Sequence, residues 1–259
     1  MKRLFIIVAV FIISFFFCDE SHAQKRKVMN LRNYNQQPYH FGFILAANQM
    51  NFTLKTIDNL PNIKWTGNQL PEDPGLVNAD YAQVLNLYAK PTPGFTIGIL
   101  GSLLLHEYID MRFTPSLSFG ERILTYDILS VTGSDSLLYT VDKNISSTLV
   151  EFPLDFKYRS KRVNNFDAYV MAGVNYTLDL ASQKKAEQNS NTTTVKINKN
   201  DLTIDVGVGI DFYTQYFKFG VELKMAYGLF NLIKKEDNLY TNSIESLHSK
   251  IFQLSFTFE

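Results

Sequence analysis

The sequence predicts an all-β fold: an eight-stranded antiparallel transmembrane β-barrel of the outer-membrane type, with short turns at one end and long loops at the other. Three observations lead to this prediction. The chain begins like an exported protein, eight later segments alternate apolar with small or charged residues, and short and long connections follow one another in turn. Its 259 residues suffice for one such barrel, since single-unit barrels commonly use about 200–250 residues.

The N-terminus has the order of a signal peptide over residues 1–23. Two basic residues come first, an apolar run covers residues 4–17, and small residues precede the expected cleavage after Ala23. A lipoprotein anchored at Cys18, the only cysteine of the chain, is the alternative. The bulky phenylalanine directly before Cys18 argues against it, because lipoprotein processing favours a small residue there.

Behind the signal peptide, residues 24–38 are expected to form a polar periplasmic N-terminal tail and residues 39–259 the barrel. The richest apolar window, residues 97–105, is too short for a transmembrane helix and contains glycine and serine. Residence in a membrane would therefore require a closed barrel, the other structure that satisfies its backbone polar groups in lipid.

Alternation with a period of two dominates the mature chain. In residues 202–212, six large apolar residues occupy one parity, while Thr, Asp and Gly occupy the other. Side chains of a strand point alternately to opposite faces, so this segment has one apolar face and one small or charged face. Eight such segments, mostly long enough to cross a bilayer at a tilt of about 45°, follow one another: residues 40–52, 94–106, 108–126, 150–158, 166–178, 202–212, 217–227 and 252–258.

The connections between these segments alternate in length. Three are short, at residues 107, 160–165 and 214–216. Four are long, at residues 53–93, 129–144, 181–199 and 233–249. Short periplasmic turns and long outer loops are typical of outer-membrane barrels, so both termini are expected in the periplasm.

The largest outer loop is expected to contain one short helix. Asn78 is in position to cap it, and Pro91 and Pro93 would stop it. Its apolar side would carry Val84, Leu85, Leu87 and Tyr88. This helix either packs on its own loop or offers an external contact.

Alternation alone also fits a secreted soluble barrel or a β-sandwich. Against these, the polar parity is rich in glycine, which is poor strand chemistry on a solvent face but suits a crowded interior. Aromatic residues gather beside the short turns, as in an interfacial girdle. The last strand ends in alternating aromatics at Phe258-Glu259, similar to the C-terminal signal of bacterial outer-membrane proteins.

Charges of both signs recur in the middle of strands. Brought together inside a tight barrel they are expected to form an ion-pair network in the lumen, whereas charges on a solvated face would need no partners. An eight-stranded interior is just wide enough for side chains to fill it, so no diffusion pore is predicted. The candidate network consists of Arg112, Arg122, Glu151, Asp155, Asp205, Asp211, Lys218, Glu222 and Lys224.

A basic turn is the candidate contact for a periplasmic partner. It carries Lys157, Arg159, Lys161 and Arg162. An acidic periplasmic protein or anionic lipid headgroups would complement these charges, and a simple solvated turn is the alternative.

The remaining chemistry is sparse, and the sequence predicts no enzyme, cofactor, metal or small-molecule substrate. The 25 Lys and Arg residues equal the 25 Asp and Glu residues, which gives no basic excess for nucleic acid. No phosphate-binding glycine loop, zinc spacing or EF-hand loop is present. His248, with Ser246 and Ser249, is the one constellation at the outer rim that a lipid hydrolase could use, but a solvated loop histidine is the simpler explanation of this spacing.

Several segments resemble the PorT (SprT-like) family of Bacteroidetes outer-membrane barrel proteins. They are residues 30–34 (NLRNY), 40–43 (HFGF), 48–52 (NQMNF), 112–122 (RFTPSLSFGER), 151–158 (EFPLDFKY), 211–213 (DFY) with 216–219 (YFKF), and 228–232 (GLFNL). This resemblance covers nearly the whole mature chain except the loops.

The resemblance implies a non-enzymatic outer-membrane component of the type IX, gliding-associated secretion machinery. This component would be surrounded by outer-membrane lipid. It would act through protein–protein contacts with other secretion proteins in the outer membrane or periplasm. A small structural or adhesive barrel of the OmpA/OmpX kind, with binding carried by its loops, is the alternative.

Overall fold

A computed structural model describes residues 28–71, 73, 75–181 and 195–259. The expected signal peptide, with Cys18 and the start of the tail, lies outside the described residues. Ten strands form one sheet: β1 Tyr39–Thr56, β2 Tyr81–Lys90, β3 Thr92–His106, β4 Ile109–Phe113, β5 Ser116–Thr132, β6 Asp135–Arg159, β7 Phe166–Asp179, β8 Asn200–Tyr213, β9 Lys218–Gly228 and β10 Ile244–Phe258. The described residues also form four short helices: η1 Tyr34–Gln36 before β1, and η2 Leu60–Asn62, η3 Gly67–Gln69 and α2 Leu239–Asn242 between strands.

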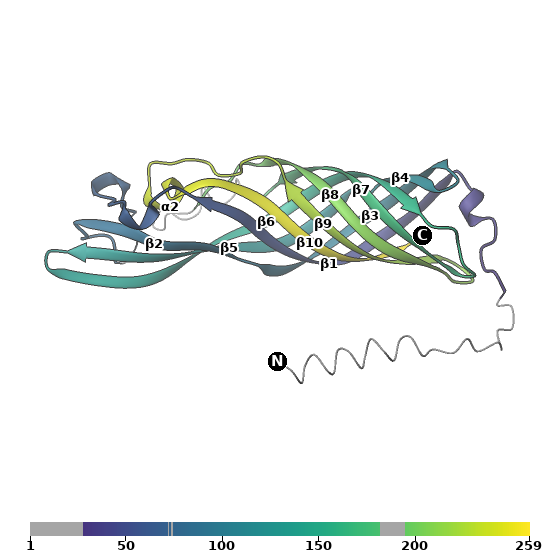
Figure 1. Cartoon of the computed structure of the whole chain (residues 1–259), viewed down its shortest axis with the longest axis horizontal. Helices are drawn as coiled ribbons and strands as arrows, with labels where there is room; N and C mark the ends of the chain where they lie inside the picture. The colour runs from purple at the N-terminus through teal and green to yellow at the C-terminus, as the bar shows by residue number, and fades with distance from the viewer. Residues whose placement is uncertain (1–27, 72, 74, 182–194) are drawn as a thin grey trace, which may run out of the picture.

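The strands pair antiparallel and curl around one long axis (Figure 1). Hydrogen-bonded neighbours run in the order β1-β10-β9-β8-β7-β6-β4-β3-β5-β2, and β5 also pairs with β6. β1 is paired on both edges, with β10 along residues 43–56 and with β3 along residues 39–50. The first and last long strands of the chain therefore lie side by side.

The third segment predicted from alternation, residues 108–126, is divided into β4 and β5. The break falls at Thr114 and Pro115, and Pro115 has no N–H to donate to a ladder. The backbone stays connected to both neighbours, because Pro115 O accepts from Ile99 N at 3.0 Å and Thr114 N donates to Pro153 O at 3.3 Å. The interruption is local.

The prediction of a helix after Asn78 is wrong, because residues 81–90 form strand β2. Ala82, Val84 and Leu87 are buried, and a register shift between Val84 and Asn86 keeps Leu87 on the buried side. Nine residues of β5 pair with β2. The tertiary ladder thus overrides a spacing that also fits a helix.

The prediction of a long outer loop at residues 129–144 is also wrong. β5 and β6 continue through it as a hairpin, in which Thr132 pairs with Asp135 across the two residues Gly133 and Ser134. Gly133 has a φ of 59°, the left-handed conformation that such tight hairpin turns require. The hairpin, with β2 paired beside it, projects beyond the other strands at the left of Figure 1.

The sheet has an apolar outward face and a polar inward face, as the alternation predicts. On β8, Ile204, Val206, Val208 and Ile210 are 42–54% exposed, whereas Asp205 is 1% exposed. Among the described residues, no helix is both long and apolar enough to cross a bilayer.

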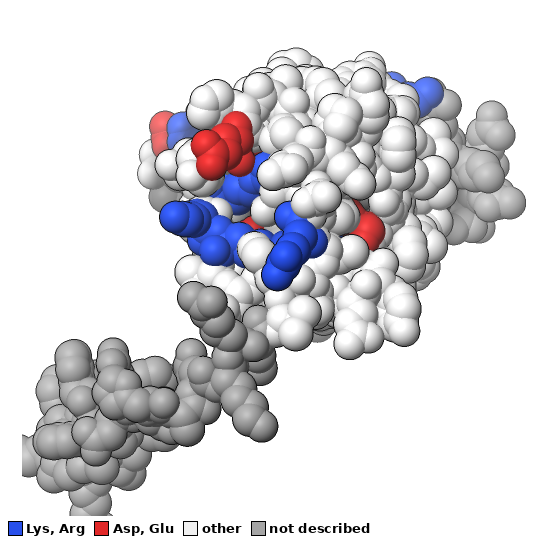
Figure 2. All heavy atoms as spheres, turned by 90° about the vertical axis from the view of Figure 1, so that its right-hand side faces the viewer, with Lys and Arg blue, Asp and Glu red and all other residues white. Residues whose placement is uncertain are grey.

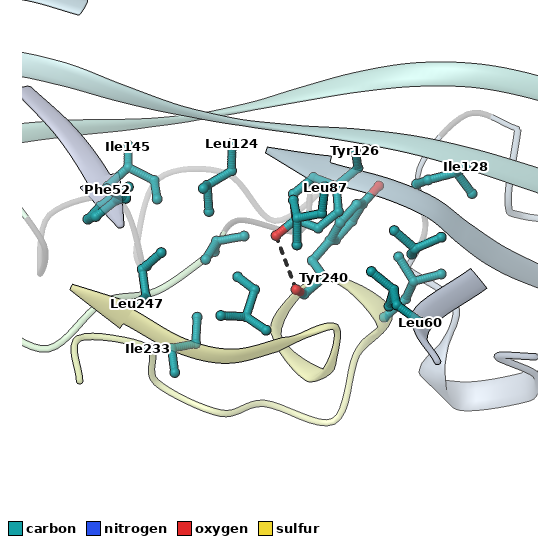
Figure 3. Packing of buried hydrophobic residues seen from close by; sticks show 14 of the residues in the cluster. Phe52, Leu60, Leu87, Leu124, Tyr126, Ile128, Ile145, Ile233, Tyr240 and Leu247 are labelled. Atoms are coloured by element: carbon teal, nitrogen blue, oxygen red, sulfur yellow. Dashed lines mark hydrogen bonds between the residues drawn. The ribbon is translucent and has the colours of Figure 1, made fainter. Parts of the chain in front are cut away.

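A second core lies at the hairpin end, in what we call the distal lobe. It comprises β2, the hairpin ends of β5 and β6, and the connections at residues 57–80 and 229–243. Figure 3 shows Leu124, Tyr126 and Ile128 from β5 facing Tyr240 and Leu247 across this core, with Tyr126 donating to Tyr240 O at 3.1 Å. In their described residues, the two connections therefore pack into this core.

Candidate functional site

The inward face carries a buried charge cluster centred on Arg112 and Glu222. Arg112 Nη1 lies 2.8 Å from Glu222 Oε2, and both side chains are 2% exposed. The Tyr169 hydroxyl donates to the same carboxylate oxygen at 3.0 Å. A buried ion pair is tolerated only where such additional hydrogen bonds offset the cost of desolvation.

Further ion pairs extend the cluster toward the short-turn end. Lys157 Nζ lies 2.5 Å from Asp211 Oδ2 and 3.6 Å from the centroid of the Tyr169 ring. Lys218 reaches the same Asp211 oxygen at 3.6 Å and Glu259 Oε2 at 2.8 Å. Each buried lysine therefore has at least one carboxylate partner.

Two other pairs lie on the distal side of Glu222. Lys224 Nζ is 3.1 Å from Asp205 Oδ2. Arg122 contacts Asp179 at 3.3 Å, donates to Ser147 and Ser249, and stacks its guanidinium on a phenylalanine ring from β1.

All nine residues of the candidate lumen network are buried on the inward face: Arg112, Arg122, Glu151, Asp155, Asp205, Asp211, Lys218, Glu222 and Lys224. Seven of them take part in the ion pairs above. Glu151 instead accepts from Ser116 and Ser118 at 3.1 and 3.0 Å. Asp155 Oδ1 has no hydrogen-bond partner among the described residues.

Inward-facing glycines make room for these carboxylates. A Cβ at Gly173 would overlap Asp155 Oδ1, one at Gly220 would lie 2.7 Å from Asp211 Oδ1, and one at Gly228 would overlap Asp201 Oδ2. Each carboxylate thus lies against the bare backbone of a glycine on the neighbouring strand. This explains why glycine and charge share one parity.

Sequence reasoning missed several members of this cluster. Asp110, Asp167, Asp179, Asp201 and Glu259 are also buried there or bound to a buried lysine. Their signal was available, because Asp167, Asp179 and Asp201 have the inward parity of their strands. Tyr169 has the inward parity of β7 as well, but parity alone does not mark a tyrosine as part of an ion-pair cluster.

The basic quartet expected at the turn is only partly exposed. Lys157 and Arg159 are buried at 1% and 4% exposure, because they share the inward parity of β6. Arg159 lies 3.5 Å from Asp110 and donates to the Glu107 carbonyl. The docking surface expected from Lys157, Arg159, Lys161 and Arg162 is therefore corrected to Lys161 and the half-buried Arg162.

Arg162 holds the N-terminal segment against the sheet rather than facing solvent freely. Its guanidinium donates to the carbonyls of Asn30 and Leu31 and lies 3.7 Å from the Tyr213 ring. Tyr34 stacks on an inward histidine of β1 at 3.8 Å. From residue 28 onward, the N-terminal tail is therefore attached to this end of the sheet.

Figure 2 views this short-turn end. Lys and Arg side chains gather on one side of the end face, beside a smaller group of Asp and Glu. The end face is therefore of mixed charge.

The distal lobe has its own buried polar group. Lys143 Nζ lies 2.6 Å from Asp73 Oδ2, and the Tyr240 hydroxyl donates to the same oxygen at 2.5 Å. Burial, together with the adjacent Asp73 carboxylate, raises the pKa of Tyr240 above its ordinary value. Through this ion pair, the connection at residues 57–80, which contains Asp73, is bound to β6, which contains Lys143.

His248 does not form a catalytic constellation with its neighbours. Its Nδ1 lies 3.2 Å from the Gly228 carbonyl, and its ring stacks on Tyr227 at 6.1 Å. Ser249 points inward to Arg122, the face opposite His248. Among the described residues, no group of three or more His, Cys, Asp or Glu is placed to hold a metal ion.

An antiparallel sheet with an apolar outward face and an ion-paired inward face defines a membrane protein of the β-barrel class. The chain belongs to the family described as outer membrane protein beta-barrel domain, whose family model matches residues 25–234. It is therefore an outer-membrane β-barrel protein.

Solved structures with a similar arrangement include Neisserial surface protein A (NspA), at 9% identity and a TM-score of 0.40, covering 85% of this chain and 98% of that one. Another is the outer membrane protein OprG from Pseudomonas aeruginosa, at 13% identity and a TM-score of 0.35, covering 86% of this chain and 95% of that one. Among curated proteins, none matches the chain.

Proposed function

We propose that the strands form a closed transmembrane barrel with eight crossings, in which β4 and β5 together make one crossing and β2 belongs to the distal lobe. Two facts support this proposal. β1 is paired on both edges, and stacked aromatic pairs occur at both ends of the outward apolar band, at Phe43 with Phe258 and at Phe95 with Phe119.

The height of the band agrees with this proposal. Its residues on β8 run from Leu202 to Phe212, which spans about 34 Å along the strand and about 24 Å along the membrane normal at a tilt of about 45°. An outer-membrane barrel exposes an apolar band of about 25 Å. The short turns then lie in the periplasm and the distal lobe lies outside the cell.

We further propose that the protein is a non-enzymatic component of the type IX secretion machinery that acts through protein–protein contacts. The observation that carries this proposal is the filled inward face, where buried ion pairs occupy the space that a pore would need. If no solute passes through the interior, the protein acts through the surfaces at its two ends, the short-turn end and the distal lobe. The resemblance to the PorT family supplies the secretion role.

Deletion of the gene is expected to leave type IX cargo trapped inside the cell envelope, because a required outer-membrane contact is lost. The measurement is the fraction of a secreted protease in culture medium and in periplasm, with re-expression of the wild-type gene as control. Normal export by the deletion strain would contradict the secretion role.

A small structural or adhesive barrel is the second candidate function. The distal lobe favours this candidate, because a packed lobe beyond the membrane offers a stable surface to a binding partner. Shortening residues 57–80 and 229–243 would then abolish surface binding while export stays normal. In a secretion component, the full deletion impairs export.

A further inference from the structure

The β5–β6 hairpin leaves one strand edge without a strand partner. β6 pairs with β5 along residues 135–151 but with β7 only from Leu149 onward. Within the described part of the chain, no strand pairs with residues 136–142 on the side where β7 would continue. We call these seven residues the free edge.

The direction of the backbone groups follows from the last contact on this side. Thr148 O accepts from Leu180 N at 2.8 Å, and Thr148 N donates to the Asp179 side chain at 3.4 Å. The backbone N–H and C=O of Thr148 therefore both point toward the β7 side. The β5–β6 register continues without a shift. Since successive residues of an antiparallel strand present these groups to opposite sides, Ser136, Leu138 and Thr140 present theirs to the free edge.

The composition of the free edge does not protect it. Residues 136–141 read SLLYTV, without charge, proline or glycine, and Leu137 and Leu138 are 56% and 63% exposed. Natural edge strands are normally blunted by lysine, proline or bulges. An unprotected, β-prone edge of this kind accepts an added strand.

Charge around the free edge defines the occupant. Asp127, Asp135 and Asp142 lie at or beside it, and Lys90 pairs with Asp142 at 3.2 Å. Hydrogen bonds from Thr125 and Lys90, with the charge of Lys90, hold the pKa of Asp142 below its usual range, so this carboxylate is ionised at neutral pH. Lys143 is buried and already bound to Asp73.

We propose that the free edge binds an extended segment of a partner protein by strand addition, and that this segment is uncharged in its centre with basic residues at its ends. A second copy of the chain fits less well, because it would bring a second set of the same aspartates to the edge. This inference does not depend on the secretion role.

The test uses the full chain in detergent micelles and a fluorescein-labelled peptide of sequence KTVTVTVK, followed by fluorescence anisotropy. Wild type and Leu138→Ala should bind it, whereas Leu138→Pro should bind at least tenfold more weakly. Proline at 138 removes an N–H that faces the free edge and leaves the ladder to β5 intact. At low salt, the peptide DTVTVTVD should bind the wild-type chain at least tenfold more weakly than KTVTVTVK. Added salt should bring the two affinities closer together, because it screens the charges.

A second measurement does not depend on the folding of a variant. Methylation of the amide nitrogens on both edges of KTVTVTVK should abolish binding to the wild-type chain, because neither edge of the peptide can then donate hydrogen bonds to the free edge. Equal binding by the methylated peptide or by Leu138→Pro would overturn the proposal. So would a wild-type chain that ignores the peptide, or one that dimerises while Leu138→Pro stays monomeric.

Discussion

Replacing Arg112 with alanine is expected to lower the free energy of unfolding by about 3–5 kcal/mol, because Glu222 would remain buried without its cationic partner. Both side chains are 2% exposed and their charged atoms lie 2.8 Å apart. The Tyr169 hydroxyl would still donate to Glu222, but one neutral hydrogen bond does not replace an ion pair. The change is measured by urea unfolding in lipid vesicles.

Two control variants separate loss of the ion pair from loss of charge in general. Lys55→Ala breaks the exposed pair with Glu245, and the urea midpoint should hardly move because water screens that pair. The double change Arg112→Leu with Glu222→Leu should cost much less than Arg112→Ala alone, because no buried charge is left unpaired. An Arg112→Ala midpoint equal to that of Lys55→Ala would contradict the buried cluster.

Replacing Val208 with arginine is expected to cost about 2–4 kcal/mol in a bilayer, the usual penalty for a cation on the lipid face near the membrane midplane. Val208 is 54% exposed in the middle of the outward row of β8. In a soluble protein, arginine at such an exposed position would be nearly neutral. The size of this effect therefore distinguishes lipid from water outside the sheet.

The matched control is Val77→Arg in the distal lobe. Val77 is at least as exposed as Val208 but lies beyond the apolar band. Its substitution should leave unfolding in the same vesicles unchanged. Equal effects at Val77 and Val208 would contradict the placement of the band in lipid.

The two faces of the sheet could be predicted from the sequence, because a period of two fixes which residues share a face. Residues 202–212 show this most clearly, since each apolar residue is outward and each aspartate inward. The same rule applied to Lys157 and Arg159 would have placed them inward. Treating them as part of a turn was the source of that error.

The partners within the inward face could not be predicted. Arg112 and Glu222 are separated by 110 positions in the sequence, and their contact depends on how each strand is registered against the next. The position of Asp155 against Gly173 also depends on that register. Alternation assigns faces but gives no register between strands.

The distal lobe was the least predictable part. Residues 78–90 carry apolar residues at spacings that fit a helix or a bulged strand, and only the ladder to β5 decides between them. The alternation of residues 129–144 is less regular than that of the membrane band, so the sequence alone predicts a loop where β5 and β6 form a hairpin.

Nitroxide spin labels on single cysteines along β8 test the central claim most directly, that the apolar row contacts lipid. In vesicles, labels at Ile204, Val206, Val208 and Ile210 should collide frequently with dissolved oxygen, which concentrates in lipid, and rarely with a water-soluble nickel complex. A label at Asp205 should collide rarely with both reagents. Labels that meet neither reagent at the four apolar positions, with the nickel complex reaching Asp205, would contradict the account.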